Sequence, residues 1–421
     1  MILALALTSG ILSHTDVNVV IVPDRISPLA HVRAAVYSGS AEDPRGKEGV
    51  AWATARVMLD RAGSLRPLDG MTASVERDVT IFSLAIEGRK LDSALDALAT
   101  ILIEPIEPRI EIGAILDARE TDGAGAADAV FDAILFMGHP YASPPEGTPR
   151  SRAGITGQDL ADFHAGHYRK GNLAIGVAGA VNDGVPERIR AAFEPLGDGE
   201  PARVRRQPSY PTVPRVFVIA NPGSARTILR IGQPLSATRG HPDHAAILLA
   251  AGCLEEAAGP AAIRIGSDRI GRRTGAFQMT MEVDPAEAGQ AVRDTVGSLV
   301  AAAGKGLSED CLAEAASTLE ESVRDILPDR ALEMRLSEFL HGDGGRAERF
   351  AAVVSEPSPE TVRSALSAHL SPGRLSIVAI VPDTGAFVEQ LRSTQIEGWH
   401  PLRASDFEIT SLERTLDQGG F

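Results

Sequence analysis

The sequence predicts an α+β protein built from two copies of one unit, and three observations support this fold class. Segments typical of strands and helices follow one another in the same order in two halves of the chain. A proline-rich segment without apolar periodicity, residues 197–214, separates the halves. A shift of 202 residues places the helix cap, helix and strand of residues 156–178 on residues 358–380 without a gap.

The elements of the first half are predicted from apolar spacing. Strands are predicted at residues 17–22, 32–36, 78–86 and 173–179. Helices are predicted at residues 48–59, 91–103, 110–136, 156–168 and 186–193, and the third of these is long. Thr156 and Asp159 stand at the spacing of a capping box, which predicts that a helix begins there.

The second half repeats this order and sets the expected domain boundaries. Strands are predicted at residues 215–219, 227–233 and 276–283, helices at 241–258, 286–303 and 308–326, and a closing helix and strand near 358–381. We therefore expect an N-terminal domain over residues 1–196, a linker over 197–214, a C-terminal domain over 215–384 and a tail over 385–421.

Composition and charge exclude some classes of partner. The chain has 56 Asp and Glu against 41 Lys and Arg, which gives a formal charge of −15. Nucleic acid binding requires clustered Lys and Arg, so we expect no nucleic acid partner, whereas the charge is compatible with a basic peptide. No apolar run approaches the ~18–20 residues of a membrane span, so we expect no membrane contact.

Cysteine usage predicts a cytoplasmic protein. Cys253 and Cys311 lie in separate Ala/Leu-rich segments that are predicted to be helical. Two cysteines cannot form a disulfide framework, and we expect two buried thiols in a reducing compartment. The first residues, MILALALTSGIL, lack a basic segment before their apolar part, and we interpret them as a strand rather than an export signal.

Several segments together resemble the M16 peptidases, the family of pitrilysin, insulinase and the mitochondrial processing peptidase. Residues 37–49 (YSGSAEDPRGKEG) resemble the connection between a strand and the following helix in that family. HPY at 139–141, GT at 147–148 and ITGQDLADFHAGHYRKGNL at 155–173 resemble its first-domain signature. The resemblance covers residues 15–383. It implies two tandem homologous domains, each a mainly antiparallel sheet covered by helices, that form half of a clam-like chamber.

The zinc motif of active M16 peptidases is replaced in this chain. Those members carry His-x-x-Glu-His on the helix after the connection, where two His on one face bind zinc and the Glu is the general base. The resemblance places these positions on Trp52, Ala55 and Arg56, none of which can do either task.

The third zinc ligand of the family is a glutamate on a later helix. The resemblance places that position on Ala118. A shift of one or two residues would bring Asp117 or Glu120 there, and either carboxylate could also pair with Arg56. One carboxylate does not hold zinc. We therefore expect no metal, no cofactor and no catalysis in this chain.

Two pairs of histidines stand three residues apart on predicted helices. They are His164 with His167, and His241 with His244. This spacing allows two metal ligands, but we identify no carboxylate third ligand for either pair. We expect both pairs to serve packing or capping.

A basic glycine-containing loop in the second half is the candidate for substrate contact. Single-zinc members of the family hold the substrate backbone with an arginine and a tyrosine of the second domain. Arg264 is the nearest match to that arginine, and Arg269, Arg272 or Arg273 would match under a different gap. No tyrosine occurs nearby, and a solvated basic loop is the alternative interpretation.

The sequence therefore predicts a non-catalytic partner subunit of a heterodimeric M16 metallopeptidase. A homologue that carries zinc would be the partner, and the two chains would enclose a peptide. A small precursor peptide, such as that of pyrroloquinoline quinone, is one candidate substrate. The alternative prediction is a non-enzymatic structural or core subunit of a larger assembly.

Overall fold

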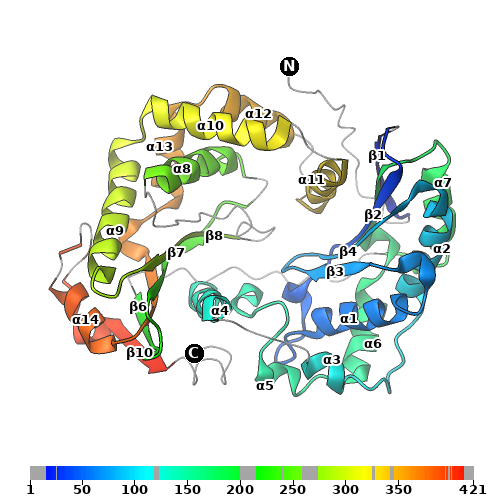
Figure 1. The fold of residues 1–421 in the computed structure, drawn as a ribbon, viewed down its shortest axis with the longest axis horizontal. Helices are drawn as coiled ribbons and strands as arrows, with labels where there is room; N and C mark the ends of the chain where they lie inside the picture. Colours follow the sequence, from blue (N-terminus) through cyan, green and yellow to red (C-terminus); the bar gives the residue numbers. More distant parts are fainter. Residues whose placement is uncertain are drawn as a thin grey trace. The chain divides into compact units, whose positions relative to one another are not determined.

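The computed structural model describes residues 16–24, 26–117, 123–199, 215–238, 241–257, 274–324, 328–341, 346–393, 395–396, 399 and 401–411. The chain forms two compact units, each with one five-stranded sheet (Figure 1). Unit 1 comprises Met1–Glu120, Ser143–Arg206 and Asp325–Gly344, and unit 2 comprises Thr121–Ala142, Gln207–Arg324 and Gly345–Phe421.

The sheet of unit 1 has the strand order β1-β5-β2-β4-β3. Its strands are β1 (Asn18–Pro23), β2 (Leu29–Val36), β3 (Thr72–Val75), β4 (Thr80–Glu87) and β5 (Leu173–Gly179). β1 runs parallel to β5, and the other neighbouring strands are antiparallel. The predicted α+β class is confirmed, and this sheet is mainly antiparallel as expected of each domain. The sheet of unit 2 departs from that expectation, because two of its pairs of neighbouring strands are parallel and two are antiparallel.

Helices cover both faces of this sheet. The helices of unit 1 are α1 (Val50–Ala62), α2 (Leu91–Ile103), α3 (Gly113–Asp117), α5 (Pro149–Arg152), α6 (Gly157–His167), α7 (Val185–Phe193) and α11 (Pro328–His341). On β2, Ala34 and Val36 lie in the core with α1, α2 and α6, whereas Ala35 belongs to a second cluster with Leu332 and Leu336 of α11. Because both faces are covered, every residue of β5 is buried, which explains its unbroken run of small and apolar residues.

The sheet of unit 2 has the strand order β10-β6-β9-β7-β8. Its strands are β6 (Arg215–Ala220), β7 (Thr227–Leu235), β8 (Gly275–Val283), β9 (Ser376–Val381) and β10 (Phe407–Ser411). β6 is parallel to β9 and β10, and β7 is antiparallel to β8 and β9. β10, which lies within the expected tail, is therefore an edge strand of the sheet.

The core of unit 2 lies between one face of its sheet and several helices. These helices are α8 (His244–Ala257), α9 (Ala288–Lys305), α10 (Glu309–Arg324), α12 (Arg346–Ser355), α13 (Pro359–His369) and α14 (Thr384–Arg392). Alternate residues of the central strand β9, Ile377, Ala379 and Val381, point into this core. Helix α4 (Gly123–Leu135) also packs on β7 and β9.

Two helices belong to a different unit from their neighbours in the sequence. α11 follows the strands of unit 2 in the chain but packs on β1, β2 and β5 of unit 1. α4 precedes the proline-rich segment but packs on the sheet of unit 2. Gly176 of β5 permits the close approach of α11, because a Cβ there would stand 2.5 Å from Leu332 Cδ1. Almost all of the expected linker lies outside the described residues, so the boundaries at 196 and 215 stay predictions.

The duplication predicted from the sequence is visible in the closing elements of each unit. α6 and α13 begin and end 202 residues apart, at 157 and 359 and at 167 and 369. Thr156 and Ser358 cap these helices, and each side chain accepts the backbone N–H three residues later. Each helix leads, through a short 3-10 turn, into an interior strand of its sheet, β5 in unit 1 and β9 in unit 2.

Two expectations about local structure are corrected. The long helix predicted over 110–136 is instead α3 and α4, which begin at residues 113 and 123 and belong to different units. Cys253 and Cys311 form a disulfide between α8 and α10, with Cα atoms 5.5 Å apart, rather than two thiols. These two helices pack against each other, so a tertiary contact pairs cysteines that are 58 residues apart in the chain.

Candidate functional site

The segment before α1 is held by the half-buried carboxylate of Asp43. Asp43 Oδ2 accepts the backbone N–H of Gly49 at 2.7 Å, and Oδ1 accepts that of Ala51 at 2.8 Å. Burial raises the pKa of Asp43 well above its ordinary value, against the lowering effect of these two hydrogen bonds. Through these two hydrogen bonds, Asp43 supplies acceptors for backbone N–H groups at the start of α1, which have no partner within the helix.

Glycines of the two segments that carry the family resemblance are in contact with each other. Gly49 (φ 108°) and Gly147 (φ 72°) both have left-handed backbones. A Cβ on Gly147 would stand 1.9 Å from the carbonyl oxygen of Glu48, a distance that no side chain tolerates. Ser151 Oγ donates to the same carbonyl at 2.7 Å. The glycines of these motifs are therefore explained by the packing of one loop on another.

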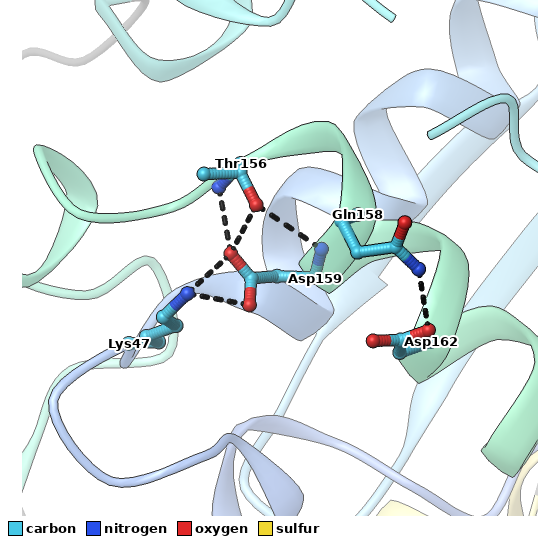
Figure 2. Close-up of polar contacts among 5 residues, drawn as sticks. All are labelled: Lys47, Thr156, Gln158, Asp159 and Asp162. Atoms are coloured by element: carbon cyan, nitrogen blue, oxygen red, sulfur yellow. Dashed lines mark hydrogen bonds and ion pairs between the residues drawn. The ribbon is translucent and has the colours of Figure 1, made fainter. Parts of the chain in front are cut away.

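Lys47 joins the same two segments by an ion pair (Figure 2). Its Nζ lies 2.6 Å from both carboxylate oxygens of Asp159, which also completes the capping box with Thr156 at the start of α6. Figure 2 shows a second pair on α6, where Gln158 donates to Asp162. Desolvation opposes the charge of Asp159, but the hydrogen bonds from Lys47 and Thr156 outweigh it and hold the pKa of Asp159 below its ordinary value.

Replacement of Lys47 by Met is expected to lower the free energy of unfolding of unit 1 by about 1 kcal/mol at pH 7. Because the pKa of Asp159 is lower in the folded state, the stabilisation is fully present above the ordinary value of 3.8 and is lost as the pH falls through the folded value. Urea unfolding should therefore show the same loss of unfolding free energy for Lys47→Met, relative to the parent, at pH 7 and pH 5. Below pH 3.8 this loss should be smaller.

Lys90→Met is the matched control for this measurement, because Lys90 pairs with Glu87 on the surface, where both side chains are about half exposed. Its expected cost is smaller. If Lys47→Met destabilises the protein no more than Lys90→Met at pH 7, the ion pair does not hold the two segments together.

The three positions that replace the zinc motif lie on the first two turns of α1. Ala55 is 1% exposed, and Trp52 is half-buried against the core of unit 1. Arg56 is exposed, and its guanidinium carbon lies 6.0 Å from the centroid of the Trp52 ring, at the limit of a cation–π contact. An indole N–H and a guanidinium donate hydrogen bonds and have no lone pair for a metal.

The other residues predicted for the degenerate zinc site and for substrate contact lie outside the described residues. These are Ala118 and Glu120, and Arg264, Arg269, Arg272 and Arg273. Of the alternative ligand Asp117, only the backbone is described, as the last residue of α3.

The histidine pair on α6 has two separate local partners. His164 is 5% exposed, and its Nε2 lies 3.0 Å from the carbonyl oxygen of Leu102. Desolvation lowers the pKa of His164. His167 Nδ1 lies 2.9 Å from Ser38 Oγ, and the His167 ring stacks on Phe163. These contacts join α6 to α2 and to the end of β2, in agreement with a packing role.

A different group of ligand-type side chains converges in unit 2. His241, Asp243 and His369 place one donor atom each within 4.8 Å of one another, and they are the one such group of three among the described residues. From the sequence, His241 is paired with His244, and no ligand role is predicted for Asp243 or His369. The shift of 202 residues places His167 on His369, and this correspondence was the signal that the sequence offered for His369. In the structure both histidines contact a serine at the end of a strand.

A family model matches part of the chain. Residues 154–319 match the family model described as "Peptidase M16 inactive domain". No curated protein matches the sequence.

Solved structures share the fold over most of the chain. A "peptidase M16 inactive domain" from Pseudomonas fluorescens is 20% identical, with 88% of this chain and 98% of that one covered and a TM-score of 0.75. The first half of the periplasmic protease PqqL from Escherichia coli is 12% identical, with 94% and 97% covered and a TM-score of 0.72. A chain of Complex III2 from Candida albicans is 14% identical, with 90% and 98% covered and a TM-score of 0.71. The predicted resemblance to the M16 family and its fold are confirmed.

Proposed function

We propose, from an M16 fold whose matching model is that of the inactive domain, that this chain is the non-catalytic subunit of a heterodimeric M16 metallopeptidase. The observation that carries the proposal is the face of α1 formed by Trp52, Ala55 and Arg56. In active members this face would supply two zinc ligands and a general base. Here it offers a half-buried indole, a buried methyl group and an exposed cation.

The proposed partner is a homologue that carries the intact His-x-x-Glu-His motif and holds the zinc. This chain supplies two M16-type units, and a chamber of four such units needs a second chain. The net charge of −15 favours a basic peptide as substrate. We propose Arg264, Arg269, Arg272 and Arg273 as its contacts on this chain. A small precursor peptide, such as that of pyrroloquinoline quinone, stays the candidate substrate.

A structural subunit of a larger assembly is the second candidate function. The likeness to a chain of Complex III2 favours it, because this chain covers 98% of a protein from that assembly. The two functions differ in the expected partner. A structural subunit would associate with proteins other than a zinc-bearing M16 homologue and would not restore any peptidase activity.

The cytoplasmic location predicted from cysteine usage also stays a proposal. No helix among the described residues is long and apolar enough to cross a membrane. The Cys253–Cys311 bond weighs against the cytoplasm, because disulfides persist mainly in oxidising compartments. The test is to quench host cells with acid, which stops thiol–disulfide exchange, and then to measure whether Cys253 and Cys311 are free thiols or bonded. Free thiols would favour the cytoplasm, and a bond would favour an oxidising compartment.

The proposed function predicts a one-to-one complex with the zinc-bearing homologue encoded in the same genome. A stable interface of this kind should bury at least ~1,200 Å². Light scattering of the mixture should show the summed mass. Peptide cleavage should require both chains and should be lost when the motif glutamate of the partner is replaced by Gln.

The matched control keeps the partner intact and changes this chain. Replacement of Arg56 by Ala should leave cleavage by the complex unchanged, since the proposal assigns α1 no catalytic part. Peptide cleavage by this chain alone would overturn the proposal. A mixture that keeps the two separate masses, or a chain that pairs only with itself, would overturn it as well.

A further inference from the structure

Three side chains from two distant segments meet at the junction of α8 and α13. His369 is the last residue of α13, and His241 and Asp243 stand directly before α8. His369 Nε2 lies 2.9 Å from Asp243 Oδ2, and His241 Nδ1 lies 3.7 Å from the same oxygen. The rings of His241 and His369 are nearly perpendicular, with centroids 4.8 Å apart.

This arrangement is close to the geometry of a tetrahedral metal site. Zinc binds His nitrogen and carboxylate oxygen at about 2.0–2.2 Å, so tetrahedral ligand atoms stand roughly 3.3 Å apart. The separations of the two histidine nitrogens from Asp243 Oδ2, 2.9 and 3.7 Å, bracket that value. The third separation, between the ligand nitrogens of His241 and His369, is at most 4.8 Å. A rotation of the His241 side chain can shorten it. Two His and one Asp with an open fourth position form a ligand set that suits zinc.

The exposure of the three side chains allows an ion to enter. The His369 side chain is 6% exposed, whereas those of His241 and Asp243 are 37% and 35% exposed. His369 is therefore held in place by the fold, and the other two face solvent. The carboxyl-terminal end of α13 adds negative potential, and the carboxylate of Asp243 offsets the positive potential at the start of α8.

A serine orients the buried ligand. Ser236 Oγ lies 2.8 Å from His369 Nδ1, and this contact leaves Nε2 directed toward Asp243. Such hydrogen bonds to the second ring nitrogen commonly fix metal-binding histidines. In unit 1, the matching His167 keeps the contact with a serine, but its ring stacks on Phe163 and belongs to no metal-ligand group among the described residues.

We propose that His241, Asp243 and His369 form a binding site for one divalent transition-metal ion of the zinc class, with water as the fourth ligand. The ion joins the start of α8 to the end of α13. This site belongs to unit 2, whereas the degenerate motif on α1 belongs to unit 1, and the site is independent of the proposed partner. In its absence, Asp243 accepts a hydrogen bond from His369 Nε2.

The test is metal titration of the full chain, with any purification tag removed and bound metal stripped by a chelator. The probes are ZnCl₂ followed by calorimetry and CoCl₂ followed by visible absorption. One ion should bind per chain with low-micromolar or tighter affinity, and cobalt should give the intense absorption of a tetrahedral site. His241→Ala and Asp243→Asn should each weaken binding at least ~100-fold, and Ser236→Ala should weaken it ~10–100-fold.

His31→Ala is the control, because His31 lies on β2 in unit 1 and should leave the affinity unchanged. Thermal unfolding of each variant without metal shows whether it is folded. Zinc should raise the melting temperature of the parent and of His31→Ala but not, at the same concentration, that of His241→Ala or Asp243→Asn. Absence of saturable binding overturns the proposal. Binding that survives both His241→Ala and Asp243→Asn overturns it too, since the ion would then be held elsewhere.

Discussion

Reduction of the Cys253–Cys311 bond is expected to lower the free energy of unfolding of unit 2 by as much as about 4 kcal/mol. The bond joins residues 58 apart in the chain. In the chain-entropy account, a cross-link stabilises by restricting the unfolded chain, from about 3 kcal/mol for a 15-residue loop to about 4.7 kcal/mol for a 100-residue loop. Cys253 is 1% exposed, so after reduction its thiol stays in the core without the covalent bond to Cys311.

The two tryptophans allow each unit to be followed separately. Trp52 lies in unit 1, and Trp399 packs against the core of unit 2. Because the chain has two tryptophans, Trp52→Phe leaves Trp399 as the fluorescent reporter of unit 2. Urea unfolding of this variant should shift to lower urea when a reductant is added.

The control is the converse variant, Trp399→Phe, whose reporter in unit 1 should unfold at the same urea concentration with and without reductant. Cys253→Ala with Cys311→Ala should reproduce the reduced state and abolish the effect of the reductant. The protein is first shown by thiol titration to contain no free thiol. A unit 2 transition that then does not respond to reductant would contradict the expected stabilisation by the Cys253–Cys311 bond.

The sequence predicts local elements well where the signal is local. The helix at 91–103 is found at those residues, and the capping box at Thr156 begins α6 as expected. The offset of 202 residues correctly relates α6 to α13, since each helix carries its own cap and its own strand. Propensity, capping and apolar spacing act within a few residues, so they are readable without the fold.

The features that the sequence analysis missed depend on contacts between distant residues. The periodicity of 110–136 is helical throughout, but nothing in it shows that α4 packs on a different sheet from α3. The disulfide and the group of His241, Asp243 and His369 likewise depend on which helices pack together. Their residues are ordinary in their own segments, and tertiary packing alone brings them into contact.

Replacement of Asp128 by Ala is expected to lower the free energy of unfolding of unit 2 by about 3 kcal/mol, the lower end of the cost of breaking a buried ion pair. Asp128 lies on α4, and its Oδ1 accepts Arg230 Nε of β7 at 2.7 Å and Gln278 Nε2 of β8 at 3.0 Å. The Arg230 side chain is 5% exposed, so the substitution leaves a guanidinium without its carboxylate. Asp128 is 37% exposed, and water therefore recovers part of the loss.

Glu282→Ala is the matched control, since Glu282 pairs with Arg226 at the edge of the same sheet and both side chains are about half exposed or more. Its expected cost is below about 1 kcal/mol. Both variants are measured by urea unfolding with Trp399 as the reporter. Equal costs would show that α4 is held on the sheet by apolar contacts alone.

The double variant separates the loss of an ion pair from the burden of a charge left in the core. Arg230→Met removes the charge but keeps most of the apolar length of the side chain. If the cost of Asp128→Ala comes from the stranded guanidinium, Arg230→Met combined with Asp128→Ala should be more stable than Asp128→Ala alone, because apolar replacements of buried ion pairs are often neutral. If the two costs instead add, the pair contributes nothing beyond its separate side chains, and α4 needs no charged anchor on the sheet of unit 2.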